Sequence, residues 1–458
     1  MKTRRILLFL AAVVAVLAVL ALAMPAGGIH FANFELRYPT MKSVLQSVRQ
    51  RQRSIGGVSN ETPEMAQLRD SIAYYHSLVD ESDTRFWQPS DDYFDAFWQN
   101  VESAADEGRT CRILHYGDSQ IELDHISSQL RRYMQAAFGG GGPGMLPVSI
   151  ITPNPNVHLG TAGDLTHLAS FGDSNTVRSN GNYGPMMQSF RLDGTVAVSL
   201  RTSNHKNIDD AVKRFDRVTL LYNNLGGEVS TVATSKRTSR HKGIQAETWQ
   251  LDSTDRFKLR VSGAADLYAI LLDCGSGVAV DNIPMRGCSG QQFTLVGEEK
   301  LSAAYGQMDV GLIILQFGGN SVPYIKTEEA VSTYCTSMGR QIDHLHRCCP
   351  NARILFIGPS DMGRRSGGQF QTYAMLPPLV DSLIATATAH DAAYWSIYHA
   401  MGGQNSMVDW VSQGYAGKDY IHFSQQGADL MGNRLAEAFS NIYTLYTLRR
   451  RLEKGGEQ

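Results

Sequence analysis

Three residues with the chemistry of a serine-dependent enzyme stand far apart in this chain. Ser119 follows the apolar run 113–116 and precedes a helical pattern, so it is expected on a strand-to-helix turn. Asp419 and His422 lie three residues apart near the other end. A serine hydroxyl becomes a nucleophile when an imidazole accepts its proton and a carboxylate orients that imidazole. The sequence therefore predicts Ser119 as nucleophile, His422 as base and Asp419 as the orienting acid.

The Gly-Asp-Ser motif alone is a weak signal. Asp118 and Ser119 would equally serve to cap a helix, and a helical pattern follows at Ile121–Phe138. Catalysis becomes the better interpretation only if other parts of the chain supply donors for the negative charge that develops on a substrate carbonyl.

Two glycine-containing segments supply such donors. Met285–Gly290 follows one strand candidate, and Leu315–Asn320 ends another. Both are expected at the carboxyl ends of strands, where open α/β sheets place their sites. We expect the backbone N–H groups of Ser119 and Gly290 and the side-chain amide of Asn320 to form an oxyanion hole.

Alternating strand and helix patterns must position these residues. The strand candidates are Arg112–Tyr116, Gly277–Ile283, Val310–Phe317, Arg353–Gly358 and Ala392–Ser396. The helical patterns are Ile121–Phe138, Gly290–Tyr305, Glu328–Arg347, Leu376–His390 and Gln425–Thr447. Such alternation predicts a parallel α/β sheet with helices on both of its faces.

One interval breaks this alternation. The first two strand candidates are separated by far more residues than the roughly 30 of a βαβ unit. Much of the excess, Val148 to Leu272, consists of short apolar or alternating runs between clusters of Gly, Asn, Asp and Ser. Short strands at this spacing predict a β-sandwich, of the jelly-roll type, inserted into the α/β domain.

The first residues have the pattern of an export signal. Lys2, Arg4 and Arg5 precede an unbroken apolar run, Ile6–Met24. As a helix this run would be about 28 Å long, close to the hydrocarbon thickness of a bilayer, with the basic residues held in the cytoplasm. We expect export to the periplasm, with the segment either cleaved near Ala21–Ala23 or retained as a single inner-membrane anchor.

The bulk composition restricts the class of protein. With 458 residues, the chain is longer than one ordinary compact domain, so two domains are expected. A net charge of −2 gives no electrostatic basis for binding nucleic acid. The six cysteines show no zinc-like spacing, and their positions assign no disulfide pairing. We expect neither a metal nor a cofactor, because the proposed serine chemistry needs none.

Taken in order, the segments around Ser119, Gly290, Asn320 and the Asp419/His422 pair resemble the SGNH (GDSL-like) hydrolase family. The resemblance implies a flavodoxin-like, three-layer α/β/α sandwich and a carboxylic ester hydrolase. It implies the same catalytic triad and the same oxyanion donors. It covers the first strand and helix and then the chain from about Gly277 to the last helix.

Two positions beside the candidate site residues are compared with the family pattern. Ser321 follows Asn320 where the family commonly has an aspartate, which lies outside the triad. Gln120 follows the serine at a position that varies among subfamilies. The four ordered segments are specific for the family and carry no information on the substrate.

The expected domain boundaries follow from these patterns. Residues 1–28 form a signal peptide or anchor and residues 29–109 a helical lead-in. Residues 110–147 and 273–448 form a discontinuous SGNH domain, and residues 148–272 form an inserted β-rich, carbohydrate-binding-like domain.

An exported enzyme with a β-rich insertion suggests a polymeric substrate, because one domain can hold a chain while the other cuts a side group. The arrangement is similar to periplasmic peptidoglycan O-acetylesterases of the SGNH group, which carry a carbohydrate-binding-module-like insertion. We expect O-acetyl groups to be removed from a glycan, with peptidoglycan favoured. Two alternatives remain open: an O-acyltransferase acting on an envelope polysaccharide, and a non-catalytic glycan-binding envelope protein.

Overall fold

A computed structural model describes residues 29–31, 34–36 and 62–456, apart from 173–175, 179–180, 233 and 239–242. The chain divides into two compact units, residues 70–453 and residues 1–69 together with 454–458. In the second unit, β1 (Ile29–Phe31) and β2 (Phe34–Leu36) pair as an antiparallel hairpin. The predicted signal segment, residues 6–24, lies outside the described residues. Among the helices that the structure describes, none combines the length and apolar character needed to cross a membrane.

The larger unit contains a six-stranded sheet in the order β13–β4–β14–β15–β18–β3. Its strands are β3 (Phe86–Trp87), β4 (Thr110–Gly117), β13 (Gly277–Pro284), β14 (Val310–Gln316), β15 (Arg353–Ile357) and β18 (Ala393–Trp395). All neighbouring pairs are parallel except β18 and β3. The order of the parallel strands is that of flavodoxin-like sheets, as predicted. Strand β3 comes from the segment expected to be a helical lead-in, and it extends the sheet at its edge.

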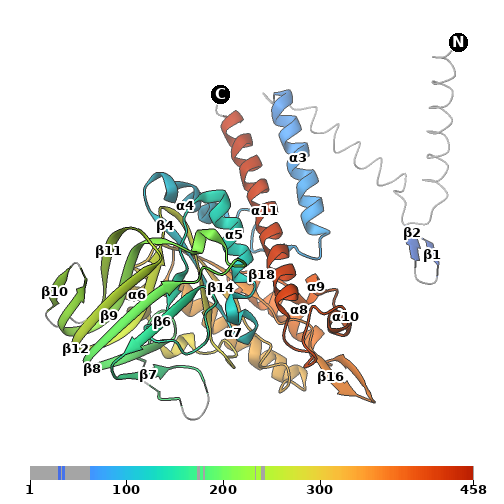
Figure 1. The fold of residues 1–458 in the computed structure, drawn as a ribbon. Coiled ribbons are helices and arrows are strands. Elements are labelled where there is room, and N and C mark those ends of the chain that lie inside the picture. Colours follow the sequence, from blue (N-terminus) through green and yellow to red (C-terminus); the bar gives the residue numbers. More distant parts are fainter. Residues whose placement is uncertain are drawn as a thin grey trace. The chain divides into compact units, whose positions relative to one another are not determined.

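Helices cover both faces of this sheet (Figure 1). One face packs against α4 (Asp95–Asp106), α5 (Ser127–Phe138) and α11 (Gln425–Gly456), and the other against α6 (Glu298–Tyr305), α7 (Glu328–Cys348) and α8 (Leu376–Ala389). Side chains of β4 alternate between the two layers: Ile113 packs with the first group and Leu114 with the second. Burial on both faces explains why the parallel strands are continuous apolar runs in the sequence.

A second sheet spans residues 144–273 and is antiparallel throughout. Its strands are β5 (Gly144–Leu146), β6 (Val157–Ala162), β7 (Leu165–Ala169), β8 (Gln188–Thr202), β9 (Phe215–Thr231), β10 (Ser235–Thr238), β11 (Ile244–Thr254) and β12 (Arg256–Asp273). Strand β8 contains two apolar runs that are separate in the sequence, 190–192 and 196–200. Strand β12 likewise contains the runs 257–261 and 268–272. The expected β-rich segment is therefore present, and its longest strands are much longer than the short runs that predicted them.

A row of glycines divides the three long strands of this sheet. Gly263 of β12 is in register with Gly194 of β8 and Gly227 of β9. Gly263 has a φ of +118°, and a Cβ there would collide with the backbone of β9. On β8, the partner strand changes from β7 to β6 across this row, and on β9 it changes from β11 to β10.

The antiparallel sheet covers its own apolar face. The cluster that includes Leu192, Val198, Leu220 and Leu259 draws its members from both sides of the glycine row and only from residues 146–272. A sheet that packs against itself must curl, and glycines permit the bend. We call it the curled sheet. It replaces the two-sheet, jelly-roll-like sandwich of the prediction, because the long strands carry the hydrogen-bond ladder through the bend.

Buried charges join the curled sheet to the α/β sheet. The guanidinium of Arg112, on β4, pairs with Asp273 at the end of β12 and with Asp281 on β13, where its Nη1 lies 2.8 Å from the carboxylate. Asp281 also accepts a hydrogen bond of 2.8 Å from the N–H of Met145 on β5. The entry and exit of the curled sheet are thus held at the same buried network, which is fully paired as burial of charge requires.

Candidate active site

The loop after β4 presents Ser119 at the carboxyl edge of the parallel sheet. Strand β4 lies between β13 and β14, whose connections leave in opposite directions, and such a switch point is where open α/β sheets form sites. A short 3₁₀ helix, η1 (Ser119–Asp124), begins at the serine. The Asp118 carboxylate caps it by accepting a 3.0 Å hydrogen bond from the Gln120 N–H. Asp118 therefore caps η1, and the Ser119 hydroxyl takes no part in this cap.

The three residues predicted as a triad are joined by hydrogen bonds. Ser119 Oγ lies 2.8 Å from His422 Nε2. His422 Nδ1 lies 2.7 Å from Asp419 Oδ2. The sequence separates the serine from the histidine by most of the chain, and the turn before α11 brings the imidazole to the loop after β4. The arrangement can move a proton from the hydroxyl to the imidazole while the carboxylate holds the ring.

The turn that carries Asp419 and His422 is organised by the carboxylate itself. Asp419 Oδ1 accepts hydrogen bonds from the N–H groups of Ile421, at 3.0 Å, and His422, at 3.1 Å. Partial burial alone would raise the pKa of Asp419. The hydrogen bonds from the His422 ring and from these two N–H groups outweigh burial and hold the pKa below its ordinary value. The acid therefore stays ionised beside the base, although both side chains are nearly half exposed, at 47% and 45%.

Gln120 ties the serine loop to the histidine turn. Its Nε2 donates to the Ile421 carbonyl at 2.7 Å and to Ser360 Oγ at 3.2 Å. Its Oε1 accepts from the Phe423 N–H at 3.2 Å. The Gln120 side chain is thus hydrogen-bonded to the backbone of the residues before and after His422. The sequence offered only an amide next to the serine, and this clamp was not predicted.

Asn320 lies at the site, but its amide group is engaged within the protein. Its Nδ2 donates to Asp118 Oδ2 and to the Cys288 carbonyl, both at 3.0 Å. To stabilise an oxyanion, Asn320 must give up one of these two bonds. Asn320 lies at the edge of the sheet where the sequence placed it, its two hydrogen-bond partners were not predicted, and its oxyanion role stays a prediction.

Asp118 is a carboxylate buried beside the relay, with a relative exposure of 4%. Burial raises its pKa from 3.8 to about 6, against the hydrogen bonds from the Gln120 N–H and the Asn320 amide and the attraction of His422. Its two oxygens fix the start of η1 and the amide of Asn320. The residue therefore organises the site without joining the relay.

Gly290 follows β13 and packs directly against the loop after β14. Its φ is +84°, and a Cβ there would lie 2.8 Å from the ring of Phe317, so only glycine fits. Its N–H donates to Cys288 Sγ at 3.4 Å, a weak sulfur contact. Tyr334 of α7 donates to the adjacent Ser289 carbonyl at 2.8 Å and steadies this turn. The oxyanion role of Gly290 remains a prediction.

The helix expected at Ile121–Phe138 is interrupted. Leu123, Asp124 and Ile126 have left-handed φ values of 57°, 63° and 62°, and α5 begins only at Ser127. Such backbone persists only where its surroundings enforce it. The buried Asp124 carboxylate is held by Arg131 at 3.0 Å and by Asn156 at 2.7 Å. Tertiary contacts to the curled sheet therefore override the local helical pattern and fix the base of the serine loop.

Two hollows open at this edge of the sheet. The first has a volume of about 210 Å³ and is lined by Ser119, Asn320, Tyr324, Met362, Ile397 and His422, among others. We call it the serine hollow. The second is larger, about 660 Å³, and shares Asn320 and Tyr324 with the first. We call it the outer hollow.

Neither a metal cluster nor a disulfide is found in the part of the chain that the structure describes. No group of three or more His, Cys, Asp or Glu side chains there could hold a metal ion. Each of the six cysteines, all of which fall among the described residues, is free.

Comparison with known proteins gives a family and a fold. Residues 252–430 match the GDSL-like Lipase/Acylhydrolase family. The matched segment includes Gly290, Asn320, Asp419 and His422 and excludes Ser119. The match confirms the class predicted from the sequence, a carboxylic ester hydrolase. No curated protein matches the chain by sequence.

Among solved structures, the chain is similar to one described as a peptidoglycan O-acetylesterase in action, with a TM-score of 0.63 and 21% identity over 75% of this chain and 95% of the other. At that identity the likeness concerns the fold. A family two carbohydrate esterase from Cellvibrio japonicus matches with a TM-score of 0.27 and 11% identity over 63% of this chain and 98% of the other. A TM-score that low carries no argument.

Proposed function

We propose that the chain is an exported serine esterase that removes O-acetyl groups from a glycan, starting from the match of residues 252–430 to the GDSL-like Lipase/Acylhydrolase family. The observation that carries the proposal is the unbroken relay of 2.8 Å and 2.7 Å from Ser119 through His422 to Asp419. Peptidoglycan is the first glycan to test, because the similar solved structure is described as a peptidoglycan O-acetylesterase.

The proposed reaction has two halves. His422 Nε2 takes the hydroxyl proton as Ser119 Oγ attacks the acetyl carbonyl carbon, and Asp419 stabilises the imidazolium that forms. The tetrahedral intermediate collapses, the sugar oxygen leaves with the proton from His422, and the acetyl group stays on Ser119. Water then loses a proton to His422 and attacks the acetyl-serine. Acetate leaves, and the proton returns to Ser119.

The oxyanion of each intermediate needs hydrogen-bond donors. We assign this role to the backbone N–H groups of Ser119 and Gly290 and to the Asn320 amide. Asn320 would exchange its bond to Cys288 or Asp118 for one to the oxyanion.

The test is acetate release from O-acetylated peptidoglycan by the wild-type chain and by Ser119→Ala. We expect the variant to lose at least about 10³-fold in rate, since the nucleophile is removed. Ser412→Ala, which removes the hydroxyl of an exposed serine on α10 (Ser406–Ser412), is the matched control and should keep full activity.

Two outcomes would contradict the proposal. Undiminished acetate release by Ser119→Ala would exclude the serine mechanism. Failure of the wild-type chain to release acetate from the glycan, while it hydrolyses p-nitrophenyl acetate, would keep the serine mechanism and exclude this substrate.

A further inference from the structure

The outer hollow adjoins the serine hollow at Asn320 and Tyr324, which line both. One side of the outer hollow comes from the turn after β13, residues 287–291. The other side comes from the loop after β14 and the start of α7 (Glu328–Cys348). If the ester carbonyl of a substrate lies beside Ser119, the rest of the substrate can extend into the outer hollow. The outer hollow is thus continuous with the predicted position of the ester.

Tyr324 is an aromatic side chain held in solvent between the two hollows. Its relative exposure is 82%, the highest of any aromatic residue among the exposed large apolar residues of the described chain. The backbone beneath it is firmly held. Val322 and Ile325 on either side are buried, and the N–H groups of Tyr324 and Ile325 donate to the Ser321 carbonyl at 2.9 Å and 3.1 Å. A fixed backbone therefore presents a ring that contributes little to the core.

The lining of the outer hollow suits an uncharged, hydroxyl-bearing ligand. It presents hydroxyl and amide side chains, from Ser289, Gln291, Ser321, Thr327 and Thr333. Of the residues that line it, Glu329 alone has a charged side chain. Hydroxyls and amides bond sugar hydroxyl and acetamido groups equally well as donors and acceptors. A strongly charged ligand would instead require several opposite charges.

We propose that the outer hollow is a subsite for an uncharged sugar ring next to the acetylated sugar, with Tyr324 as the surface on which that ring stacks. The apolar C–H face of a pyranose packs on an aromatic ring, and the ring's hydroxyl groups reach the polar lining. This inference rests on the proposed function and deepens it. It makes the preferred substrate a polymer whose neighbouring sugar contributes to binding, and it leaves the chemistry at Ser119 unchanged.

The first experiment compares a small and a polymeric ester. For Tyr324→Ala, we expect KM for acetylated peptidoglycan to rise by about 10-fold, as loss of one stacked ring implies. Its kcat/KM for p-nitrophenyl acetate should fall much less than its kcat/KM for the glycan, because this ester carries no neighbouring sugar that could occupy the outer hollow. Tyr324→Phe keeps the ring and should retain the wild-type KM. Tyr74→Ala, which removes another tyrosine that is 60% exposed on α3 (Pro63–Asp80), is the matched control and should change neither value.

A second experiment keeps the subsite testable if the esterase hypothesis fails. The β-1,4-linked tetrasaccharide of N-acetylglucosamine, which carries no ester, is titrated calorimetrically into the full chain and its variants. We expect binding to the wild-type chain and to Ser119→Ala, and binding at least about 10-fold weaker to Tyr324→Ala.

The inference is overturned by equal tetrasaccharide affinity in Tyr324→Ala, or by absence of binding to the wild-type chain. It is also overturned if Tyr324→Ala loses activity on p-nitrophenyl acetate as strongly as on the glycan, since Tyr324 would then act on the ester itself. If the wild-type chain binds the tetrasaccharide but releases no acetate from the acetylated glycan, the result contradicts the proposed function and not the subsite.

Discussion

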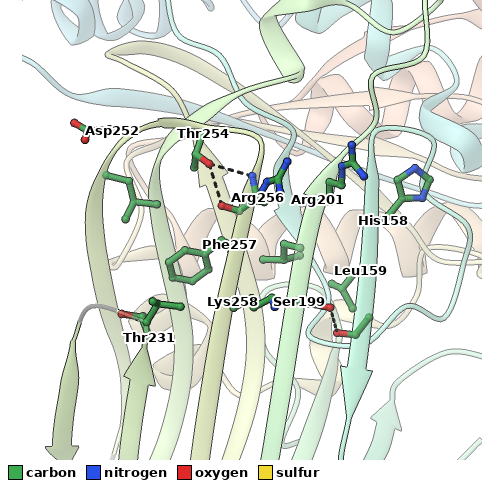
Figure 2. Close-up of a pocket in the computed structure, with 14 residues that line it drawn as sticks. His158, Leu159, Ser199, Arg201, Thr231, Asp252, Thr254, Arg256, Phe257 and Lys258 are labelled. Atoms are coloured by element: carbon green, nitrogen blue, oxygen red, sulfur yellow. Dashed lines mark hydrogen bonds between the residues drawn. The ribbon is translucent and has the colours of Figure 1, made fainter.

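The hollow within the curled sheet has a volume of about 880 Å³, against about 210 Å³ for the serine hollow. We call the larger one the sheet hollow. Figure 2 shows its lining, with His158, Arg201 and Lys258 coming from three different strands. Its charged side chains, among them Asp252 and Arg256, are exposed. The serine hollow is smaller and holds the hydrogen-bonded relay.

The difference follows from strand direction. The five parallel strands of the α/β sheet all end at one edge, so the loops after β4, β13 and β14 converge there with Ser119, Gly290 and Asn320. In the curled sheet, neighbouring strands run in opposite directions, so each edge receives alternate ends. Ser119 and His422 therefore meet at the smaller hollow, and volume alone does not locate them.

The largest expected effect separates the two hollows by their histidines. His422→Ala should lower kcat/KM for p-nitrophenyl acetate by at least about 10³-fold, because the base is lost. His158→Ala, which removes an exposed histidine of the sheet hollow, should leave it within about 2-fold. Steady-state hydrolysis at pH 7.5 measures both. A comparable loss in the two variants would break the contrast between the hollows.

The next effect contrasts a buried carboxylate with an exposed one. The folded-state pKa of Asp118 is about 6, above the ordinary 3.8. Folding is thus favoured by this group below pH 3.8, and that contribution is lost as pH rises through 6, by up to about 3 kcal/mol. Asp118→Asn removes this loss, so its free energy of unfolding relative to wild type should rise between pH 4 and pH 7.5.

Urea unfolding at the two pH values measures this difference. Asp255→Asn alters a partly exposed carboxylate near the sheet hollow, whose pKa is lowered by the hydrogen bond to Arg256, and should show no rise of that kind. If Asp118→Asn had the same pH dependence as wild type, the buried carboxylate would not set the electrostatics of the serine hollow.

The smallest effect concerns the clamp at Gln120. Gln120→Ala frees the backbone on both sides of His422, and we expect kcat for p-nitrophenyl acetate to fall by about 10-fold with KM nearly unchanged. Gln250→Ala is the control. It removes another glutamine side chain that bonds to backbone, since Gln250 Nε2 donates to the Asp216 carbonyl at 3.1 Å on the curled sheet, and it should change neither kcat nor KM. A change confined to KM in Gln120→Ala would assign Gln120 to substrate binding and not to positioning of the imidazole.

Much of the fold was accessible from periodicity and chain order. The five parallel strands follow the continuous apolar runs because both faces of that sheet are buried, and such runs need no knowledge of their partners. Helix α7 begins at Glu328, as its helical pattern predicted, and Thr327 caps it through a local hydrogen bond from the Ala330 N–H. The break after η1 could not be predicted, because Asp124 is held by Arg131 and by Asn156 of the distant β-rich segment.

The types and the order of the candidate catalytic residues could be read from the sequence alone. Ser119, Gly290, Asn320, Asp419 and His422 were named from motifs, because a nucleophile, a base, an acid and donors are chemical requirements that residue types satisfy. Tertiary structure alone decided the distances and the neighbours: the 2.8 Å contact of Ser119 with His422, the two bonds that occupy the Asn320 amide, and the curling of a single sheet where two were expected. Side-chain identity is local, whereas burial, register and hydrogen-bond partners are set by segments remote in the chain.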